Sequence, residues 1–331
     1  MSTGGRVMLD TNLWSSIGDD HASQRFDVFV QARSLEVLTP PSTLMEVCRH
    51  PVPEVRQRII SALARYPRGR LPTEAQLESA EVVAEARRLR PQWLLSMPDT
   101  AKVASLNAFW TKRVWRMAQQ DAQRIHDYQA TNAQPLIASE VLRQKHNRRS
   151  LLRGKFNLSP LTALMEKATP ERAATRAPGW NGEPVEAWRT NSREIFWYAL
   201  VSATDWSPFT GEDRTFADWV GAYLDVAAIR TDPADFTRFW LEDVEIKAVR
   251  RQWVRWAVQI VQNDRKVTPG NPADEQHSSY LVDCDLFLSA DATLISILET
   301  VGEDAPFPFA KPVLVSGDRS VPIMERLAAA L

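Results

Sequence analysis

Residues 6–10 read Arg-Val-Met-Leu-Asp, a short apolar run that ends in an acid. Three further runs of the same strand type lie at residues 35–39, 286–289 and 311–316. A helical pattern follows each of the four runs, at residues 21–33, 42–48, 292–300 and 321–331, and Ser42 or Thr43 is expected to cap the second helix. Strands that alternate with helices predict an α/β fold, with a parallel sheet that helices cover on both faces.

The chain between residues 51 and 266 has a different character, because it contains almost no strand pattern. Helices are predicted at residues 73–90, 100–129, 139–152, 192–204, 215–229, 233 onward and 246–260. The chain has 12 Trp, and all but Trp14 lie between Trp93 and Trp256. We interpret them as core residues of a helical bundle; stacking of nucleic-acid bases on an exposed minority is the other interpretation. The predicted architecture is therefore a parallel sheet interrupted by a large all-α, Trp-rich insertion.

Composition limits the classes of protein that remain. The 331 residues are 44% hydrophobic and 24% charged, which is typical of a globular chain and excludes a disordered one. A formal net charge of -1 excludes a uniformly basic surface that coats nucleic acid. Two Cys cannot build a disulfide framework, and their scarcity favours a reducing compartment. With no apolar stretch of signal-peptide or membrane-span length, we expect a cytoplasmic protein that does not enter a membrane.

Acidic residues stand where the predicted strands end. Asp10 ends the first strand, Glu46 lies one turn into the helix after the second, and Asp291 follows the third by two residues. Asp274 begins the helix that leads into the third strand. Because active sites of parallel sheets lie beyond the carboxyl ends of the strands, we expect these four carboxylates at one rim. No Lys or Arg stands in the same motifs to neutralise them.

Converging carboxylates repel one another unless a divalent cation holds them. Hard oxygen ligands favour Mg²⁺ or Mn²⁺, and such a metal site is typical of phosphodiester hydrolysis. Each acid also has an ordinary structural interpretation. A strand-end cap accounts for Asp10, a solvated helix face for Glu46, the helix dipole for Asp274 and an N-cap for Asp291. Their occurrence together, in this order, favours the metal site.

Three segments together resemble a known family. They are Val7-Met-Leu-Asp10-Thr-Asn12, Pro41-Ser-Thr-Leu-Met-Glu46, and a helix opened by Asp274 that leads through a strand to Ser289-Ala-Asp291. In the last segment the family has an Asp, a strand, and then Thr or Ser, any residue, and Asp. These features resemble the PIN-domain nucleases, and the resemblance covers residues 6–50 and 267–331.

The resemblance implies a discontinuous PIN-like nuclease domain of residues 1–50 and 267–331, interrupted by a helical insertion over residues 51–266. It implies that Asp10, Glu46, Asp274 and Asp291 bind one or two Mg²⁺ or Mn²⁺, and that Asn12 and Ser289 orient a carboxylate, the water or the phosphate. It also implies cleavage of RNA, usually single-stranded, by a metal-bound water. The insertion is much larger than the small helical segment of compact members, so we expect it to line the cleft and to influence the choice of substrate.

Other candidates are less favoured by the sequence. Asp283 and Asp285 precede the third strand and so lie at its amino end, whereas Asp318 follows the last strand and remains a candidate outer ligand. His277 lies one turn after Asp274 and is left out of the acid centre. A zinc site is unsupported, because five His and two Cys show no paired-ligand spacing. A haloacid-dehalogenase-type phosphatase needs a second Asp at the position of Asn12, and is discounted.

A basic stretch indicates the class of partner. Residues 101–160 hold 11 Lys and Arg against 3 Asp and Glu. The densest part contains Arg143, Lys145, Arg148, Arg149, Arg153 and Lys155. An ordinary solvated helix face is one interpretation, and a surface that follows nucleic-acid phosphates is the other.

The sequence therefore predicts a metal-dependent PIN-like endoribonuclease. Two alternatives stay open: a non-cleaving RNA- or protein-binding subunit on the same scaffold, and a structure-specific DNA nuclease. The expected partner is nucleic acid, with RNA favoured. An inhibitory protein partner, a homo-oligomer, and a role as a toxin, in RNA processing or in defence are left open by the sequence.

Overall fold

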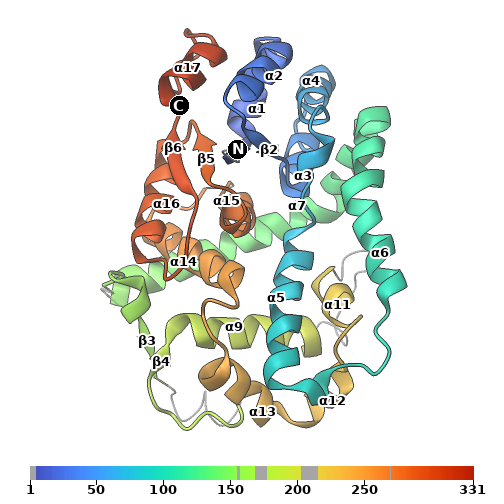
Figure 1. Cartoon of the computed structure of the whole chain (residues 1–331). Coiled ribbons are helices and arrows are strands. Elements are labelled where there is room, and N and C mark those ends of the chain that lie inside the picture. Colours follow the sequence, from blue (N-terminus) through green and yellow to red (C-terminus); the bar gives the residue numbers. More distant parts are fainter. Residues whose placement is uncertain (1–4, 155–156, 168–176, 203–214, 269) are drawn as a thin grey trace. The chain divides into compact units, whose positions relative to one another are not determined.

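The computed structural model describes residues 5–154, 157–167, 177–202, 215–268 and 270–331. The chain packs as two compact units (Figure 1). We call the first the sheet unit; it consists of residues 1–73, 107–156 and 258–331. We call the second the helical unit; it consists of residues 74–106 and 157–257.

The sheet unit contains the strands β1 (Arg6–Leu9), β2 (Glu36–Leu38), β5 (Leu286–Ser289) and β6 (Lys311–Leu314). Its α-helices are α1 (Thr11–Asp19), α2 (Ser23–Ala32), α3 (Pro41–Cys48), α4 (Pro53–Leu63), α7 (Val114–Gly154), α15 (Asn271–Ser278), α16 (Ala292–Asp304) and α17 (Ile323–Ala330). Short helical turns lie at η1 (Pro67–Gly69) and η7 (Ser279–Val282), and a π-helical turn lies at η3 (Phe109–Arg113).

The four strands form one parallel sheet in the order β2-β1-β5-β6, so the two ends of the chain share it. Met8 pairs with Leu38 on one side and with Phe287 on the other, and Leu288 pairs with Val313. The parallel sheet flanked by helices that the sequence predicts is confirmed. Leucines and valines fill these strands because a parallel sheet is covered on both faces.

Side chains alternate along each strand, and the two faces of the sheet therefore contact different helices. Val7, Leu9 and Leu288 belong to a buried cluster that also contains apolar residues of α1, α2, α3, α4, α7 and α17. Met8 and Phe287 point to the opposite face and are also buried. Helix α16 packs against β5 and β6. This packing holds the carboxyl ends of β1 and β5 side by side.

The helix boundaries differ from the sequence prediction at several places. Helix α1 follows β1 at once, and α4 begins at Pro53; the sequence pattern indicated neither. Helix α3 begins at Pro41 with Pro40 as its N-cap, so the prediction of a Ser42 or Thr43 cap is wrong. Proline suits the first helical position because it has no N–H to leave unpaired.

The predicted helices 100–129 and 139–152 are part of one longer helical stretch. It runs from α6 (Thr100–Ala108) through η3 into α7 and ends at Gly154, with non-helical backbone at Asp121. Conversely, the predicted helix 215–229 is two helices, α11 (Thr215–Val220) and α12 (Val226–Thr231).

The helical unit is built from α5 (Glu74–Leu89), α6, α9 (Ala187–Trp197), α11, α12 and α13 (Pro233–Arg238). Short turns lie at η2 (Pro91–Trp93) and η4 (Leu161–Ala163), and π-helical turns lie at η5 (Tyr198–Ser202) and η6 (Phe239–Asp243). The strands β3 (Met165–Glu166) and β4 (Val185–Glu186) form a small antiparallel pair. Helix α14 (Arg250–Asp264) contains residues of both units.

Aromatic rings fill the interior of the helical unit. The rings of Phe196 and Trp240 stack with centroids 4.5 Å apart, and Trp93 contacts Phe236 and Phe239. Every Trp side chain that the structure describes is buried or half-buried, and Trp206 lies outside the described residues. Within the described part of the chain, no exposed Trp is therefore present for base stacking.

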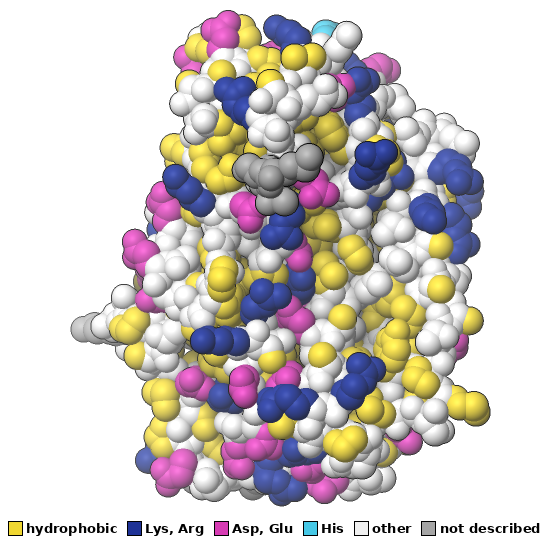
Figure 2. Space-filling view, viewed as in Figure 1, with side chains coloured by type: hydrophobic (Ala, Val, Ile, Leu, Met, Phe, Trp, Pro, Cys, Tyr) yellow, Lys and Arg dark blue, Asp and Glu magenta, His cyan; other side chains and the backbone are white. Residues whose placement is uncertain are grey.

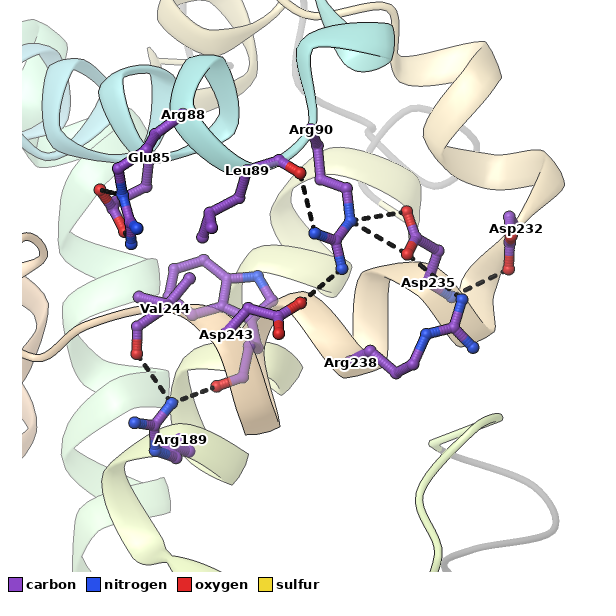
Figure 3. A network of polar contacts seen from close by, with 11 residues as sticks. Glu85, Arg88, Leu89, Arg90, Arg189, Asp232, Asp235, Arg238, Asp243 and Val244 are labelled. Atoms are coloured by element: carbon purple, nitrogen blue, oxygen red, sulfur yellow. Dashed lines mark hydrogen bonds and ion pairs between the residues drawn. The ribbon is translucent and has the colours of Figure 1, made fainter.

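Arginines tie the segments of the helical unit to one another (Figure 3). The Arg90 side chain lies between two carboxylates, with Nε 2.9 Å from Asp235 Oδ2 and Nη2 2.5 Å from Asp243 Oδ2. Arg189 donates from Nη1 to the carbonyl oxygens of Trp240 and Val244. These bonds tie the end of α5 to α13 and η6, and α9 to η6 and the residue after it.

Among the described residues, no helix has both the length and the apolar character that a membrane span requires.

Gly69 lets the chain lie against the edge of the sheet. Its carbonyl oxygen accepts a hydrogen bond from the Thr39 amide, 2.8 Å away, just after β2. A Cβ atom at position 69 would lie 1.8 Å from the carbonyl oxygen of Val37. A side chain of any size is therefore excluded there unless the backbone moves.

We expect Gly69→Ala to lower the free energy of unfolding by about 1–3 kcal/mol, because the backbone must separate to admit the methyl group. Chemical denaturation followed by circular dichroism measures this. Gly270→Ala is the control, since its Cβ would come no closer than 3.6 Å to a neighbouring atom. Equal stability of Gly69→Ala and wild type would contradict the close approach.

Candidate functional site

Asp10 lies at the carboxyl end of β1 and is 9% exposed. It is the N-cap of α1, and its Oδ1 accepts a hydrogen bond from the Thr11 amide at 2.7 Å. Its Oδ2 accepts hydrogen bonds from Ser289 Oγ and Asn12 Nδ2, both at 2.5 Å. One oxygen of Asp10 thus caps α1, a helix that the sequence did not predict, while the other oxygen faces the end of β5.

Asn12 and Ser289 join the ends of the two central strands. Asn12 Nδ2 also lies 3.1 Å from Ser289 Oγ, and Asn12 Oδ1 accepts the Ala290 amide at 3.2 Å. Ser289 Oγ in turn accepts the Asp291 amide at 3.0 Å. The two residues for which the sequence predicts a supporting role therefore both contact Asp10. Their polar bonds hold its carboxylate in one orientation.

Glu46 comes from α3 and is oriented by a residue that sequence reasoning missed. Thr11 Oγ1 donates to Glu46 Oε2 at 2.7 Å. The imidazole Nδ1 of the buried His277 lies 3.8 Å from the same oxygen. The sequence signal for Thr11 was its hydroxyl directly after Asp10, in the first turn of a helix. Its partner, 35 positions away, is defined only by the fold.

Asp274 lies in the first turn of α15 and is half-buried. Gln262 Nε2 of α14 lies 3.4 Å from its Oδ2. Burial, and after it the negative charges of Asp10, Glu46 and Asp291, together raise the pKa of Asp274 to about 8. The other three predicted acids are therefore close enough to repel Asp274, although the four come from four separate segments.

The pKa of Asp10 is raised as well, chiefly by burial and also by the charge of Glu46. The hydrogen bond from Ser289, the charge of His277 and the Thr11 amide oppose this rise. Among the described residues, no Lys or Arg forms an ion pair with any of the four acids. His277 is the cationic partner that the described chain supplies, and only when it is protonated.

Asp291 is the most exposed of the four acids. It caps α16, with Oδ1 accepting the amides of Thr293 and Leu294 at 2.7 and 3.0 Å. Its helix-cap interpretation is therefore correct, and its charge nevertheless reaches Asp274. A role as helix cap does not exclude a role as metal ligand, because the second oxygen, Oδ2, has no hydrogen-bond partner among the described residues.

The donor set suits a hard cation, but the carboxylates are not gathered around one point. Within the described residues, no group of three His, Cys, Asp or Glu side chains is arranged to hold a metal ion. Glu46 Oε1, Asp274 Oδ1 and Asp291 Oδ2 each have no hydrogen-bond partner in the described chain. Three uncommitted carboxylate oxygens, at mutually repelling groups, are the ligand type that Mg²⁺ and Mn²⁺ prefer.

Two of the three competing acids lie at the other end of β5. Asp285 Oδ2 accepts the Arg6 amide at 2.7 Å, at the amino end of β5, and Asp283 precedes it. Asp318 is exposed and binds the amide and hydroxyl of Ser320, and these bonds lower its pKa. A Cβ at Gly317, the preceding residue, would lie 3.8 Å from the carbonyl oxygen of Ala290, so Asp318 follows β6 at the same rim as Asp291.

The predicted basic stretch lies at the end of α7, where the structure divides it. Lys145, Arg149 and Arg153 are exposed and recur every four residues, so they share one helix face. Arg143 forms an ion pair with Glu140, with Nη2 2.5 Å from Oε1. Arg148 is half-buried. Lys155 lies outside the described residues.

A second basic group was not singled out from the sequence. Figure 2 shows Lys and Arg side chains gathered at its right-hand edge, over the helical stretch in which α6 continues toward α7. The exposed Lys112, Arg113 and Arg116 lie on this stretch. Their signal in the sequence was the high local positive charge, of which they form part.

Comparisons with known proteins gave no relative: no family model, no curated protein and no solved structure matches the chain.

The raised pKa of Asp274 predicts a pH-dependent stability of the metal-free protein. The Asp274 carboxyl has a pKa of 3.8 in the unfolded chain and about 8 in the folded protein. The free energy of unfolding therefore falls as the pH rises through that window. We expect Asp274→Asn to match wild type near pH 4 and to be more stable at pH 8. The gain should be at least about 1 kcal/mol, since one pKa unit corresponds to about 1.4 kcal/mol.

Thermal denaturation in EDTA across this pH range measures the difference. Glu303→Gln, exposed on α16, is the charge-matched control and should follow wild type at every pH. A difference between Asp274→Asn and wild type that does not grow with pH would refute the assigned repulsion.

Proposed function

We propose that the chain is a metal-dependent endonuclease with a PIN-like nuclease domain, acting on RNA, most readily on a single strand. The observation that carries this proposal is the electrostatic coupling of the four acids. Asp10, Glu46 and Asp291 all raise the pKa of Asp274, and no described Lys or Arg pairs with them. A group of uncompensated carboxylates at the carboxyl ends of parallel strands is best stabilised by a divalent cation.

In the proposed site, Asp10, Glu46, Asp274 and Asp291 hold Mg²⁺ or Mn²⁺. When bound, the cation supplies positive charge for the phosphate and lowers the pKa of a water for attack on the phosphodiester. Ser289 and Asn12 orient the Asp10 carboxylate, and Thr11 orients that of Glu46. Asp291 keeps one oxygen on the α16 amides and leaves the other free to bind.

The PIN-like assignment is supported by the order of the elements and by the motif residues. The strand order β2-β1-β5-β6 places Asp10 and Ser289 on neighbouring strands. In this proposal residues 1–50 and 267–331 form the nuclease domain, and the Trp-rich region 51–266 is an insertion. The basic face of Lys145, Arg149 and Arg153 supplies positive charge for a nucleic-acid backbone.

A non-cleaving nucleic-acid-binding protein is the second candidate. It is favoured by the open arrangement of the acids, since no described group of three is set to hold a metal. A cleavage assay on labelled single-stranded RNA, single-stranded DNA and duplexes, with Mg²⁺, Mn²⁺ or EDTA, separates the two. It also distinguishes an RNA nuclease from a DNA nuclease.

We expect Asp10→Asn and Asp291→Asn to reduce cleavage to the level seen in EDTA while leaving the protein folded. Mn²⁺ at about 100 times its Kd should stabilise wild type by about 2.7 kcal/mol, because it binds only the folded state. This stabilisation should shrink in both variants. Asp283→Asn and Asp285→Asn are the controls, because both residues lie at the amino end of β5, and both should retain cleavage. Loss in the controls, with cleavage kept in Asp10→Asn or Asp291→Asn, would overturn the acid assignment.

We expect the triple substitution of Lys145, Arg149 and Arg153 by Gln to weaken RNA binding. Each lost phosphate contact should lower the log–log salt slope by about 0.7 for a single strand. Fluorescence anisotropy at salt concentrations from about 50 to about 200 mM measures the slope. The control replaces three exposed basic residues earlier in the same stretch, Lys112, Arg116 and Arg124, by Gln. Equal salt slopes for the two triple variants would contradict the prediction, because RNA binding would then depend only on the net charge of the protein.

A further inference from the structure

Three buried amide side chains contact the acidic start of α15. Gln259 and Gln262 of α14 and Gln144 of α7 are each at most 6% exposed. Val258 and Val261 of α14 are buried and apolar, so this part of α14 packs in the core. A buried amide destabilises a core unless both its ends are hydrogen-bonded.

Gln262 does not meet that condition. Its Nε2 lies 3.4 Å from Asp274 Oδ2, whereas its Oε1 is buried with no hydrogen-bond partner among the described residues. An apolar side chain of the same length would avoid the unpaired oxygen. Within the described part of the chain, the contact with Asp274 is the one polar contact that the amide makes.

We propose that Gln262 is a positioning residue for Asp274. Its Nε2 holds Oδ2 of the carboxylate, and Oδ1 stays available to a cation. Because Asp274 is one of the proposed metal ligands, this inference rests on the proposed function. It adds a residue from the Trp-rich region of the sequence to the machinery of the acid centre.

The other amides serve the neighbouring acid. Gln259 Nε2 and Gln144 Nε2 lie 3.4 and 3.5 Å from Glu275 Oε2. Consecutive helix residues point about 100° apart, so Glu275 and Asp274 leave α15 in different directions. Gln259 therefore provides a matched control: it is the same residue type, on the same helix, also buried, and it contacts the adjacent acid.

The test compares Gln262→Met with Gln259→Met, since Met keeps the length of Gln and removes the donor. Isothermal titration calorimetry with Mn²⁺ measures affinity. We expect Gln262→Met to bind Mn²⁺ about 10- to 100-fold more weakly, as for other partners of metal ligands, and Gln259→Met to stay within about twofold of wild type. Gln262→Leu is the second variant should Gln262→Met fail to fold: it also removes the donor, and it is expected to weaken Mn²⁺ binding in the same way.

Wild-type affinity in Gln262→Met, or an equal loss in Gln259→Met, would overturn the positioning role. A second measurement does not depend on metal: a double-mutant cycle of unfolding in EDTA. Gln262→Met and Asp274→Asn should be non-additive, and Gln259→Met and Asp274→Asn should be additive. If the first pair couples but wild type binds no Mn²⁺, the contact stands and the proposed function fails. If wild type binds Mn²⁺ and the pair does not couple, the proposed function stands and the positioning role fails.

Discussion

The parallel pairing of β1 with β5 is the constraint on which the rest of the sheet unit depends. The Asp10 amide donates to the Leu288 carbonyl at 2.8 Å, which continues the pairing one residue beyond the strand. Ser289 and Asp10 thereby meet although they are 279 positions apart in the chain. A parallel pair needs a crossover between its strands, and here the crossover contains most of the protein. Neither end of the chain could form this sheet, or this site, alone.

The same pairing places charges together at a cost in stability. Burial and mutual repulsion raise the pKa values of both Asp10 and Asp274, so the folded state resists ionisation of these groups. Most of a folded protein avoids such an arrangement, and residues that keep it commonly serve a function. The hydrogen bonds from Ser289, Asn12 and Thr11 reduce the cost for Asp10 and Glu46 without supplying a positive charge.

Local sequence was sufficient for the strands and for the acids that follow them. Apolar runs ending at Asp10 and Ser289 identify strand ends, and the carboxyl-end rule then brings the acids to one rim. It was insufficient for the groups that orient these acids. Thr11 and Gln262 have no pattern of their own, because each is defined by a partner that only the folded chain brings near. The sequence also could not separate the exposed Arg149 from the half-buried Arg148, since their faces depend on where α7 packs.

Asp10 is held by more hydrogen bonds than Glu46 or Asp274. Asp10 is buried at the end of β1 and held by three donors, two from α1 and one from β5, so its position follows directly from the sheet. Glu46 and Asp274 come from helices, and each is held by one side-chain donor, Thr11 or Gln262. In the proposed site, Asp10 is therefore the fixed ligand, and Glu46 and Asp274 are the ligands with fewer hydrogen bonds to give up when a cation binds.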